Sequence, residues 1–331
     1  MGFSAPTGSG RARRFRADRT LVGMISNEHH DVIVVGGGPA GVSCALECFD
    51  IQLDTVLVEA SSILGGQLPD ISHSVRNVAA GRFENGSVLQ QALQESAAIL
   101  GDRARLSHRV SKTDLGDRWI ETQGGHWSGR ALVVATGTSR QHLPMAADGA
   151  FGGDVTYQLE PEPGAFVGGA VAVIGGGDSA TLDALALAGM GSSVKLVHRS
   201  ENLTARQDIL RQVRDEPRIE ELAGWELQAL HGTDRLEEIV LVRPATGEQR
   251  RIAAQGLVIK ISRVPNTGLF EGQLDLDRSG AVIVDRELRT NLIGVFAAGD
   301  VVSNAYPRVA SAFGQGVLAA RSVLRYLDGR S

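Results

Sequence analysis

The chain of 331 residues is poor in cysteine, in excess charge and in long apolar runs. Its two cysteines, Cys44 and Cys48, exclude a small secreted scaffold built on disulfide bonds and favour a reducing, cytoplasmic location. The net charge of −5 predicts no basic surface for nucleic acid. No apolar run approaches the roughly 18 residues that a membrane-spanning helix needs. We therefore expect a globular cytoplasmic protein with no nucleic-acid partner, no membrane partner and no metal site.

Glycine, in contrast, is abundant, with 41 residues, and it gathers in two loops of the phosphate-binding type. The loops are Gly36-Gly37-Gly38-Pro39-Ala40-Gly41 and Gly175-Gly176-Gly177-Asp178-Ser179-Ala180. Each follows a β-branched apolar run and precedes a helix-forming stretch. A single GxGxxG motif is a weak signal, but two copies in matching strand–loop–helix contexts rarely arise by chance. The chain is predicted to bind two dinucleotides, a flavin and a nicotinamide.

The first loop is predicted to lie between a buried parallel strand over 31–35 and a helix over 42–49. Unpaired backbone N–H groups at a helix N-terminus attract a pyrophosphate, and glycine lets the backbone approach it closely. The next strand, over 55–58, ends at Glu59. Its carboxylate stands where such units hold the ribose hydroxyls, roughly 20 residues past the loop.

The second loop has the same context, with strands over 171–174 and 193–197 and a helix that ends near Ala188. His198-Arg199 follows the second strand, so no acid stands at the ribose position. An arginine attracts a 2′-phosphate and an acid repels it, which favours NADP over NAD. The residues predicted to bind NAD(P) are Gly175, Gly177, Asp178, Ser179, His198, Arg199 and Arg206.

Further motifs follow in a definite order: Gly65-Gly66-Gln67, Ala135-Thr136-Gly137, Pro265-Asn266-Thr267 and Gly294-Val295-Phe296-Ala297-Ala298-Gly299-Asp300. Together with the two loops, this order resembles the low-molecular-weight thioredoxin reductase family over about residues 31–327. Ferredoxin–NADP reductases of the thioredoxin-reductase type are similar on the same scaffold. The resemblance therefore indicates the architecture more firmly than the substrate.

The resemblance implies FAD contacts at each of these motifs. Gly36, Gly38, Pro39, Ala40 and Gly41 would hold the pyrophosphate, Glu59 the adenosine ribose, Gln67 and Asn77 the flavin side, and Asp300 the ribitol or pyrophosphate. Arg308 would set a positive charge near the pyrimidine end of the flavin ring. The remaining implied FAD residues are Gly66, Ala135, Thr136, Gly137, Gly299, Val309 and Ala310.

The chain departs from this family at the redox-active Cys-x-x-Cys. The two cysteine positions of the family fall on Gln158 and Pro161, and neither residue can carry out thiol chemistry. Cys44 and Cys48 lie instead in the helix after the first loop, where buried structural cysteine is the expected interpretation. We do not expect a dithiol enzyme.

The segment 157–163, which stands at the dithiol position, contains two prolines and is predicted to be a rigid extended loop. Two interpretations remain open. Tyr157 stacks on the flavin or donates a hydrogen bond while Glu160 or Glu162 protonates a substrate. Alternatively, the loop only covers the ring and both glutamates face water.

The nicotinamide half also departs from the family. Ser200 and Thr204 replace two arginines of the family, which weakens the expected NADPH preference unless Arg206 compensates. Lys260 and Arg263 stand in a stretch that is small in relatives. Their charges, close to a predicted hinge, either alter nicotinamide access, contact a partner or do neither.

The motif order predicts an α/β fold with two Rossmann-like domains of the three-layer ββα type. The FAD domain comprises residues 26–140 and 267–331, and the NAD(P) domain, 141–266, is inserted in it. Residues 1–25 are arginine-rich and read as a disordered tail. Crossovers near 140–144 and 265–270 are expected to act as hinges.

We expect an FAD-dependent oxidoreductase that takes hydride from NADPH or NADH and passes electrons to an acceptor other than a disulfide. The acceptor is a redox protein such as ferredoxin or flavodoxin, a quinone, dioxygen or a small metabolite. The family resemblance implies a homodimer. Two alternatives remain: a flavin oxidase or tailoring enzyme with a degenerate nicotinamide site, and a flavin-bound sensor without catalysis.

Overall fold

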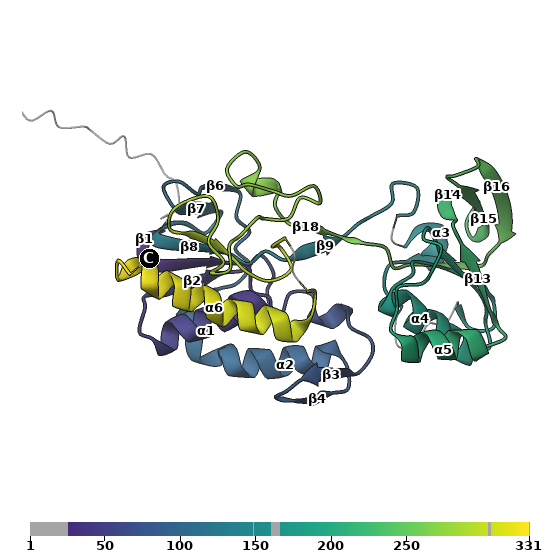
Figure 1. The fold of residues 1–331 in the computed structure, drawn as a ribbon, viewed down its shortest axis with the longest axis horizontal. Coiled ribbons are helices and arrows are strands. Elements are labelled where there is room, and N and C mark those ends of the chain that lie inside the picture. The colour runs from purple at the N-terminus through teal and green to yellow at the C-terminus, as the bar shows by residue number, and fades with distance from the viewer. Residues whose placement is uncertain (1–25, 148, 160–165, 304–305, 331) are drawn as a thin grey trace, which may run out of the picture.

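The computed structural model describes residues 26–147, 149–159, 166–303 and 306–330, so the predicted tail at 1–25 lies outside the described residues. The described chain forms two lobes, between which two short strands run (Figure 1). These strands are β9 (Thr138–Arg140) and β18 (Arg263–Pro265), and they pair antiparallel. The second lobe lies between them in the sequence, so the predicted insertion of one dinucleotide-binding unit in the other is confirmed.

The first lobe is built on a seven-stranded sheet in the order β5-β2-β1-β8-β7-β6, with β19 paired to β8. Strands β5, β2, β1, β8 and β19 run parallel to one another, whereas β7 and β6 form an antiparallel extension beside β8. The strands are β1 (Ser26–Val35), β2 (Thr55–Val58), β5 (Ala104–Arg105), β6 (Lys112–Asp114), β7 (Trp119–Thr122), β8 (Gly125–Val134) and β19 (Val295–Ala297).

Helices α1 (Pro39–Asp50), α2 (Gly86–Ala97) and α6 (Val309–Leu327) gather beside this sheet, with α1 and α6 side by side (Figure 1). A Cβ atom on Gly316 of α6 would lie 2.2 Å from the carbonyl oxygen of Ala40. Only glycine therefore lets the last helix pack directly against the helix that begins at the first glycine loop. A short 3₁₀ turn (Leu68–Asp70) and a hairpin of β3 (Val75–Val78) and β4 (Gly81–Phe83) precede α2.

The second lobe has three layers. Its central sheet is parallel, in the order β10-β17-β11-β12-β13. Two helices pack on one face, and a three-stranded antiparallel sheet contributes to the apolar cluster on the other. The predicted ββα layering is confirmed. The elements are α3 (Ala150–Gly153), β10 (Val155–Thr156), β11 (Ala170–Ile174), α4 (Asp178–Gly189), β12 (Ser193–His198), α5 (Gln207–Asp215), β13 (Ile219–Ala223), β14 (Glu226–Gly232), β15 (Leu236–Arg243), β16 (Glu248–Ala253) and β17 (Gly256–Ile259).

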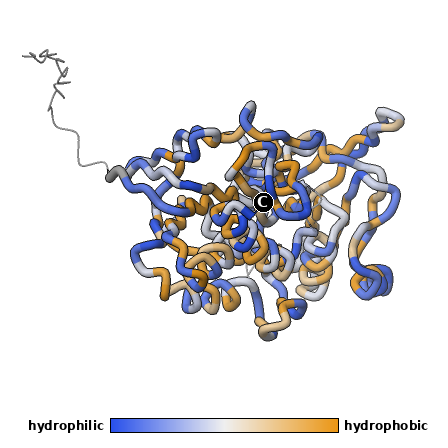
Figure 2. Tube along the Cα trace, turned by 60° about the vertical axis from the view of Figure 1, so that its left-hand side comes forward, coloured by the Kyte–Doolittle hydropathy of each residue, from blue (hydrophilic) through white to orange (hydrophobic). Residues whose placement is uncertain are grey.

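Apolar runs of the sequence form the inner strands, as expected for parallel strands covered on both faces. Residues 32–35 and 171–174 are all buried. In Figure 2, many of the apolar segments lie toward the inside of the molecule. The predicted strand over 55–58 matches the observed bounds. Both helices that follow the glycine loops begin within the loop, because Pro39 and Asp178 suit the first helical position.

Candidate functional site

A cleft of about 1690 Å³ lies between the two lobes, and both glycine loops line it. The carboxyl ends of β1 and β11 lead into these loops. Ligands of open α/β sheets bind at this edge, so the topology alone places two nucleotide sites on one cleft.

The first loop lacks room for a side chain at two of its glycines, Gly36 and Gly41. A Cβ on Gly36, whose φ is +108°, would lie 2.4 Å from the carbonyl oxygen of Ala135. A Cβ on Gly41 would lie 1.8 Å from the carbonyl oxygen of Gly36. These contacts hold α1 close to the sheet and leave the backbone N–H groups of the loop at a helix N-terminus, an arrangement suited to a pyrophosphate.

Glu59 lies beside this loop. One carboxylate oxygen accepts a hydrogen bond from the backbone N–H of Gly37 at 2.5 Å, and the other accepts one from the backbone N–H of Ser61 at 2.7 Å. The carboxylate is thus held at the end of β2, next to the loop, which is the position at which ribose hydroxyls are bound in such units.

The other motifs predicted for FAD converge on the same cleft. Gln67 donates a hydrogen bond to the hydroxyl of Thr138 at 3.0 Å and packs against Gly137. Gly299 has a φ of +87°, and a Cβ there would lie 2.9 Å from that of Ala40. Burial raises the pKa of Asp300 beside it, and the charge of Arg263 opposes this shift. FAD therefore fits a backbone cradle that only glycines can form, flanked by two carboxylates able to accept hydrogen bonds from its hydroxyl groups.

The second loop repeats this geometry with different side chains. A Cβ on Gly175, whose φ is +141°, would lie 2.2 Å from the carbonyl oxygen of Lys260. His198 lies against Gly176, as Glu59 lies against Gly37 in the first lobe. Its Nε2 atom is 3.0 Å from a carboxylate oxygen of Glu221 on the neighbouring strand β13. An acid is thus present near the ribose position, although it is absent from the end of β12.

Charged residues also surround the start of α4. Asp178 accepts a hydrogen bond from the backbone N–H of Arg206 at 2.9 Å, and the side chain of Arg206 lies 3.3 Å from the same carboxylate. Arg308, at the start of α6 in the first lobe, approaches Asp178 at 3.8 Å across the cleft. Arg308 therefore faces the second glycine loop. Arg199 and Ser179 are exposed and line the cleft.

Two predicted site residues, Asn77 and Arg206, need correction, and the hydroxyl of a third, Tyr157, is engaged within the second lobe. Tyr157 is buried in the second lobe, where its hydroxyl accepts a hydrogen bond from the N–H of Leu143 at 2.7 Å and donates one to the carbonyl of Ala146 at 3.0 Å. These backbone partners hold its hydroxyl inside the lobe, although the residue also lines the cleft. Asn77 is exposed on the β3–β4 hairpin and does not line the cleft. Arg206 is exposed, turned to Asp178, and also outside the cleft lining.

The remaining predicted residues are located only by whether they line the cleft. Gly38, Pro39, Gly66, Thr136 and Val309 line the cleft, whereas Ala310 is exposed on the first turn of α6. Glu160 and Glu162 lie outside the described residues.

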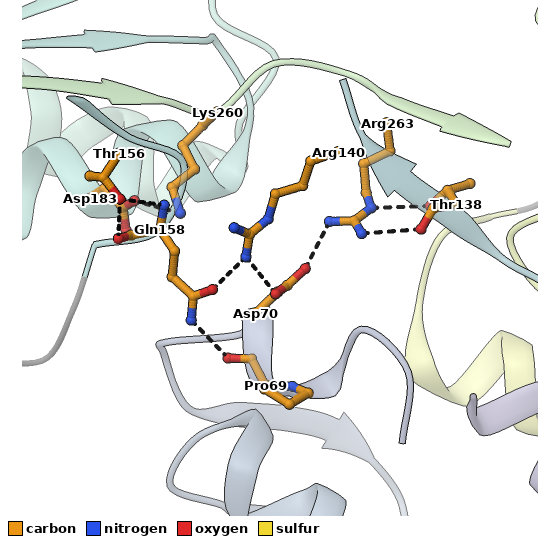
Figure 3. Close-up of polar contacts among 9 residues, drawn as sticks. All are labelled: Pro69, Asp70, Thr138, Arg140, Thr156, Gln158, Asp183, Lys260 and Arg263. Carbon is orange, nitrogen blue, oxygen red and sulfur yellow. Dashed lines mark hydrogen bonds and ion pairs between the residues drawn. The ribbon is translucent and has the colours of Figure 1, made fainter. Parts of the chain in front are cut away.

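A buried ion pair in the second lobe was not predicted from the sequence. The Nζ atom of Lys260 lies 3.0 Å from a carboxylate oxygen of Asp183 on α4, and the two side chains are 12% and 6% exposed (Figure 3). Burial raises the pKa of Asp183, and the charge of Lys260 opposes this. The sequence marked Lys260 as an unusual charge in a stretch that is small in relatives. No sequence pattern indicated that its partner is Asp183, which lies within an ordinary helix.

A second unpredicted feature is a polar cluster between the lobes, formed by Asp70, Arg140, Arg263 and Gln158 (Figure 3). The sequence marks Arg263 as unusual, but its partner Asp70 lies far away in the chain. Among the described residues, no group of histidine, cysteine and acidic side chains is arranged to hold a metal ion. The helices of the described ranges include none with the length and apolarity of a membrane span.

Comparison with known proteins gives the family. Residues 30–316 match the family model described as pyridine nucleotide-disulphide oxidoreductase. The chain is 33% identical to a thioredoxin reductase of Streptomyces clavuligerus, over 90% of this chain and 94% of that protein. It is 28% identical to a 34.2 kDa protein in a rubredoxin operon of Clostridium pasteurianum, over 93% of this chain and 100% of the relative.

A solved structure shares the fold. The Lactococcus lactis thioredoxin reductase in its FR conformation superposes with a TM-score of 0.80 at 28% identity, over 91% of this chain and 99% of that one. Proteins of this family use FAD together with NADPH or NADH, as the two glycine loops predict. The chain thus belongs to the pyridine nucleotide-disulphide oxidoreductase family, in its thioredoxin-reductase-like branch.

Proposed function

We propose that this FAD-dependent oxidoreductase passes electrons from NAD(P)H to an acceptor other than a disulfide. The observation that carries the proposal is the residue at the dithiol position. Gln158 stands where the resemblance places the first cysteine, and its side-chain amide is engaged with Arg140 and with the carbonyl oxygen of Pro69. An amide cannot form a mixed disulfide, so electrons must leave by another route.

The two cysteines of the chain do not replace the missing dithiol. Cys44 and Cys48 are both fully buried in α1, within the apolar cluster that includes α6. The hydrogen bond with Cys48 and burial raise the pKa of the Cys44 thiol. The thiolate is the reactive form of cysteine, so a buried thiol with a raised pKa is a poor nucleophile.

FAD, when bound, supplies the group that accepts two electrons and releases them singly or in pairs. The chain's own residues would bind and orient it: the first glycine loop at the pyrophosphate, Glu59 at the adenosine ribose and Asp300 at the ribitol or pyrophosphate. In the second lobe, the loop 175–180 would receive the nicotinamide nucleotide. Both loops open on one cleft, which supports direct transfer between the two nucleotides.

A redox protein is one acceptor class that this arrangement suits. The rubredoxin-operon relative matches the chain over its whole length, and its name associates it with an electron carrier. Quinones, dioxygen and small metabolites are the other candidates. We further propose a homodimer in the cytoplasm, which sedimentation and fractionation would test.

Anaerobic stopped-flow spectroscopy tests the proposal. NADH or NADPH should bleach the flavin absorbance rapidly, while reduction of thioredoxin or of an aromatic disulfide should remain at background. A Cys44→Ser/Cys48→Ser variant is the matched control and should bleach like the parent. Disulfide reduction that the control variant loses would contradict the proposal. Bleaching by a small molecule but by neither nucleotide would favour an oxidase, and flavin binding with no reduction would favour a sensor.

A further inference from the structure

Asp70 connects the first lobe to both strands that run between the lobes. It ends the 3₁₀ turn that follows Gln67. One carboxylate oxygen accepts a hydrogen bond from Arg140, at the end of β9. The other accepts a hydrogen bond from Arg263, at the start of β18, at 3.1 Å (Figure 3). A single carboxylate therefore links both connections between the lobes to the FAD-binding side.

Arg263 is further held by β9. Its guanidinium donates to the hydroxyl of Thr138 at 3.1 Å and to the carbonyl oxygen of Thr138 at 3.2 Å. The two connecting strands are thus joined by side-chain hydrogen bonds as well as by their backbone pairing. The side chains of Asp70, Arg140 and Arg263 are between 23% and 32% exposed, so they are partly shielded from water and the hydrogen bonds are charge-assisted.

Gln158 brings the second lobe into this cluster. Its side-chain oxygen accepts a hydrogen bond from Arg140, and its side-chain nitrogen donates one to the carbonyl oxygen of Pro69 at 3.3 Å. Thr156 orients the backbone of Gln158, with hydrogen bonds of 2.7 and 3.0 Å. Glutamine suits this position because one side chain can both accept and donate. The residue at the dithiol position therefore docks the inserted lobe on the first lobe.

This docking coincides with a particular arrangement of the nucleotide loops. Both loops line the same cleft, and Arg308 of the first lobe approaches Asp178 of the second glycine loop. Two short strands do not by themselves prevent rotation of one lobe against the other, because a hinge needs only a few residues that change their backbone angles.

We propose that Asp70, Arg140 and Gln158 are positioning residues that hold the inserted lobe with its nucleotide loop facing the FAD-binding loop. This inference rests on the function proposed above. It gives the dithiol position a new role, because Gln158 favours the arrangement of the lobes in which the nicotinamide nucleotide reduces the flavin. Loss of Gln158 or of the Asp70 charge shifts the lobes toward other orientations and slows this reduction.

The test uses the FAD-loaded full chain with Asp70→Asn and Gln158→Leu. Asp70→Asn keeps the side-chain shape and removes the charge, and Gln158→Leu removes both hydrogen bonds at similar size. Glu84→Gln, which neutralises an exposed carboxylate elsewhere in the first lobe, is the matched control. Small-angle X-ray scattering reports the arrangement of the lobes. Anaerobic kinetics compare flavin reduction by NADH or NADPH with reduction by dithionite, which does not need the second lobe.

The scattering profile of both variants should correspond to a broader distribution of shapes than that of the parent. Flavin reduction by NADH or NADPH should slow about tenfold, which is the effect expected of losing one charge-assisted hydrogen bond. Dithionite reduction and the control should match the parent. Unchanged scattering would overturn the proposal, and so would equal slowing by dithionite. If no nucleotide reduces the parent protein, the proposed function fails, while a changed scattering profile of the variants would still support the positioning role.

Discussion

Lys260→Met should destabilise the inserted lobe strongly, because it leaves the carboxylate of Asp183 buried without its partner. The two charges lie 3.0 Å apart and their side chains are 12% and 6% exposed. Removal of one partner from such a buried pair costs about 3–5 kcal/mol. For a lobe of this size, each kcal/mol lowers the melting temperature by about 3–5 °C, so a fall of about 10–25 °C is expected.

The loss should depend on pH in a definite direction. Burial raises the folded-state pKa of Asp183 above its ordinary value of 3.8, and Lys260 opposes this. The folded protein therefore holds a proton at pH values where the unfolded chain has released it, and stability falls as the pH rises through this window. Without Lys260 the pKa rises further. The variant should be least stable at neutral and alkaline pH and should recover as mild acid protonates Asp183.

Differential scanning calorimetry at neutral and mildly acidic pH measures both effects. Lys195→Met is the matched control, because Lys195 pairs with Glu220 at the surface of the same lobe and such a pair is worth about 1 kcal/mol or less. The double variant Lys260→Met/Asp183→Leu should regain most of the lost stability. The reasoning is refuted if Lys260→Met costs no more than Lys195→Met, or if the double variant is as unstable as the single one.

Two further substitutions test the nucleotide sites, and a third tests an ion pair between Asp154 and Arg235. Glu59→Gln removes the charged acceptor beside the first loop, and flavin fluorescence should report an FAD affinity about 10- to 100-fold weaker; an unchanged affinity would contradict the assigned role. Glu221→Gln removes a carboxylate next to His198, so calorimetric titration should show a shift of about two- to fivefold toward NADPH over NADH, and a constant ratio would argue against it. The hydrogen bond from Arg235 lowers the pKa of Asp154 in the folded protein. The ionised carboxylate therefore stabilises the fold at pH values above its ordinary pKa, and this stabilisation is lost as the pH falls through the lowered pKa. Asp154→Asn should therefore lower the neutral melting temperature and flatten its acid dependence, and an unaltered melting curve would show that the pair contributes nothing.

The sequence was sufficient for the parts of the site that depend on the backbone. The glycine loops could be recognised because each occurs between a strand and a helix. Their glycines are required because a side chain at Gly36, Gly41 or Gly175 would collide with the backbone. The acid at Glu59 could be located because a short strand of known direction ends there. These features are local, so residue type and spacing determine them.

Side-chain assignments around the cleft were harder to predict. Tyr157 lines the cleft, but its hydroxyl, expected to act at the flavin, is held inside the second lobe by the backbone at Leu143 and Ala146. Arg206 was expected to attract a 2′-phosphate, but its side chain is paired with the carboxylate of Asp178. In each case the competing partner lies elsewhere in the sequence, and only the folded chain brings it within hydrogen-bonding distance.

Two dinucleotide-binding units, one inserted in the other, and the absence of a dithiol were determined by the sequence itself, since they depend on local glycine geometry, motif order and residue identity. The tertiary structure decided what lies between those units. It paired Lys260 with Asp183, placed Glu221 beside His198, and linked Asp70 to Arg140 and Arg263. Such pairs form between residues distant in sequence, where the energy of a contact depends on burial and distance that no linear pattern contains.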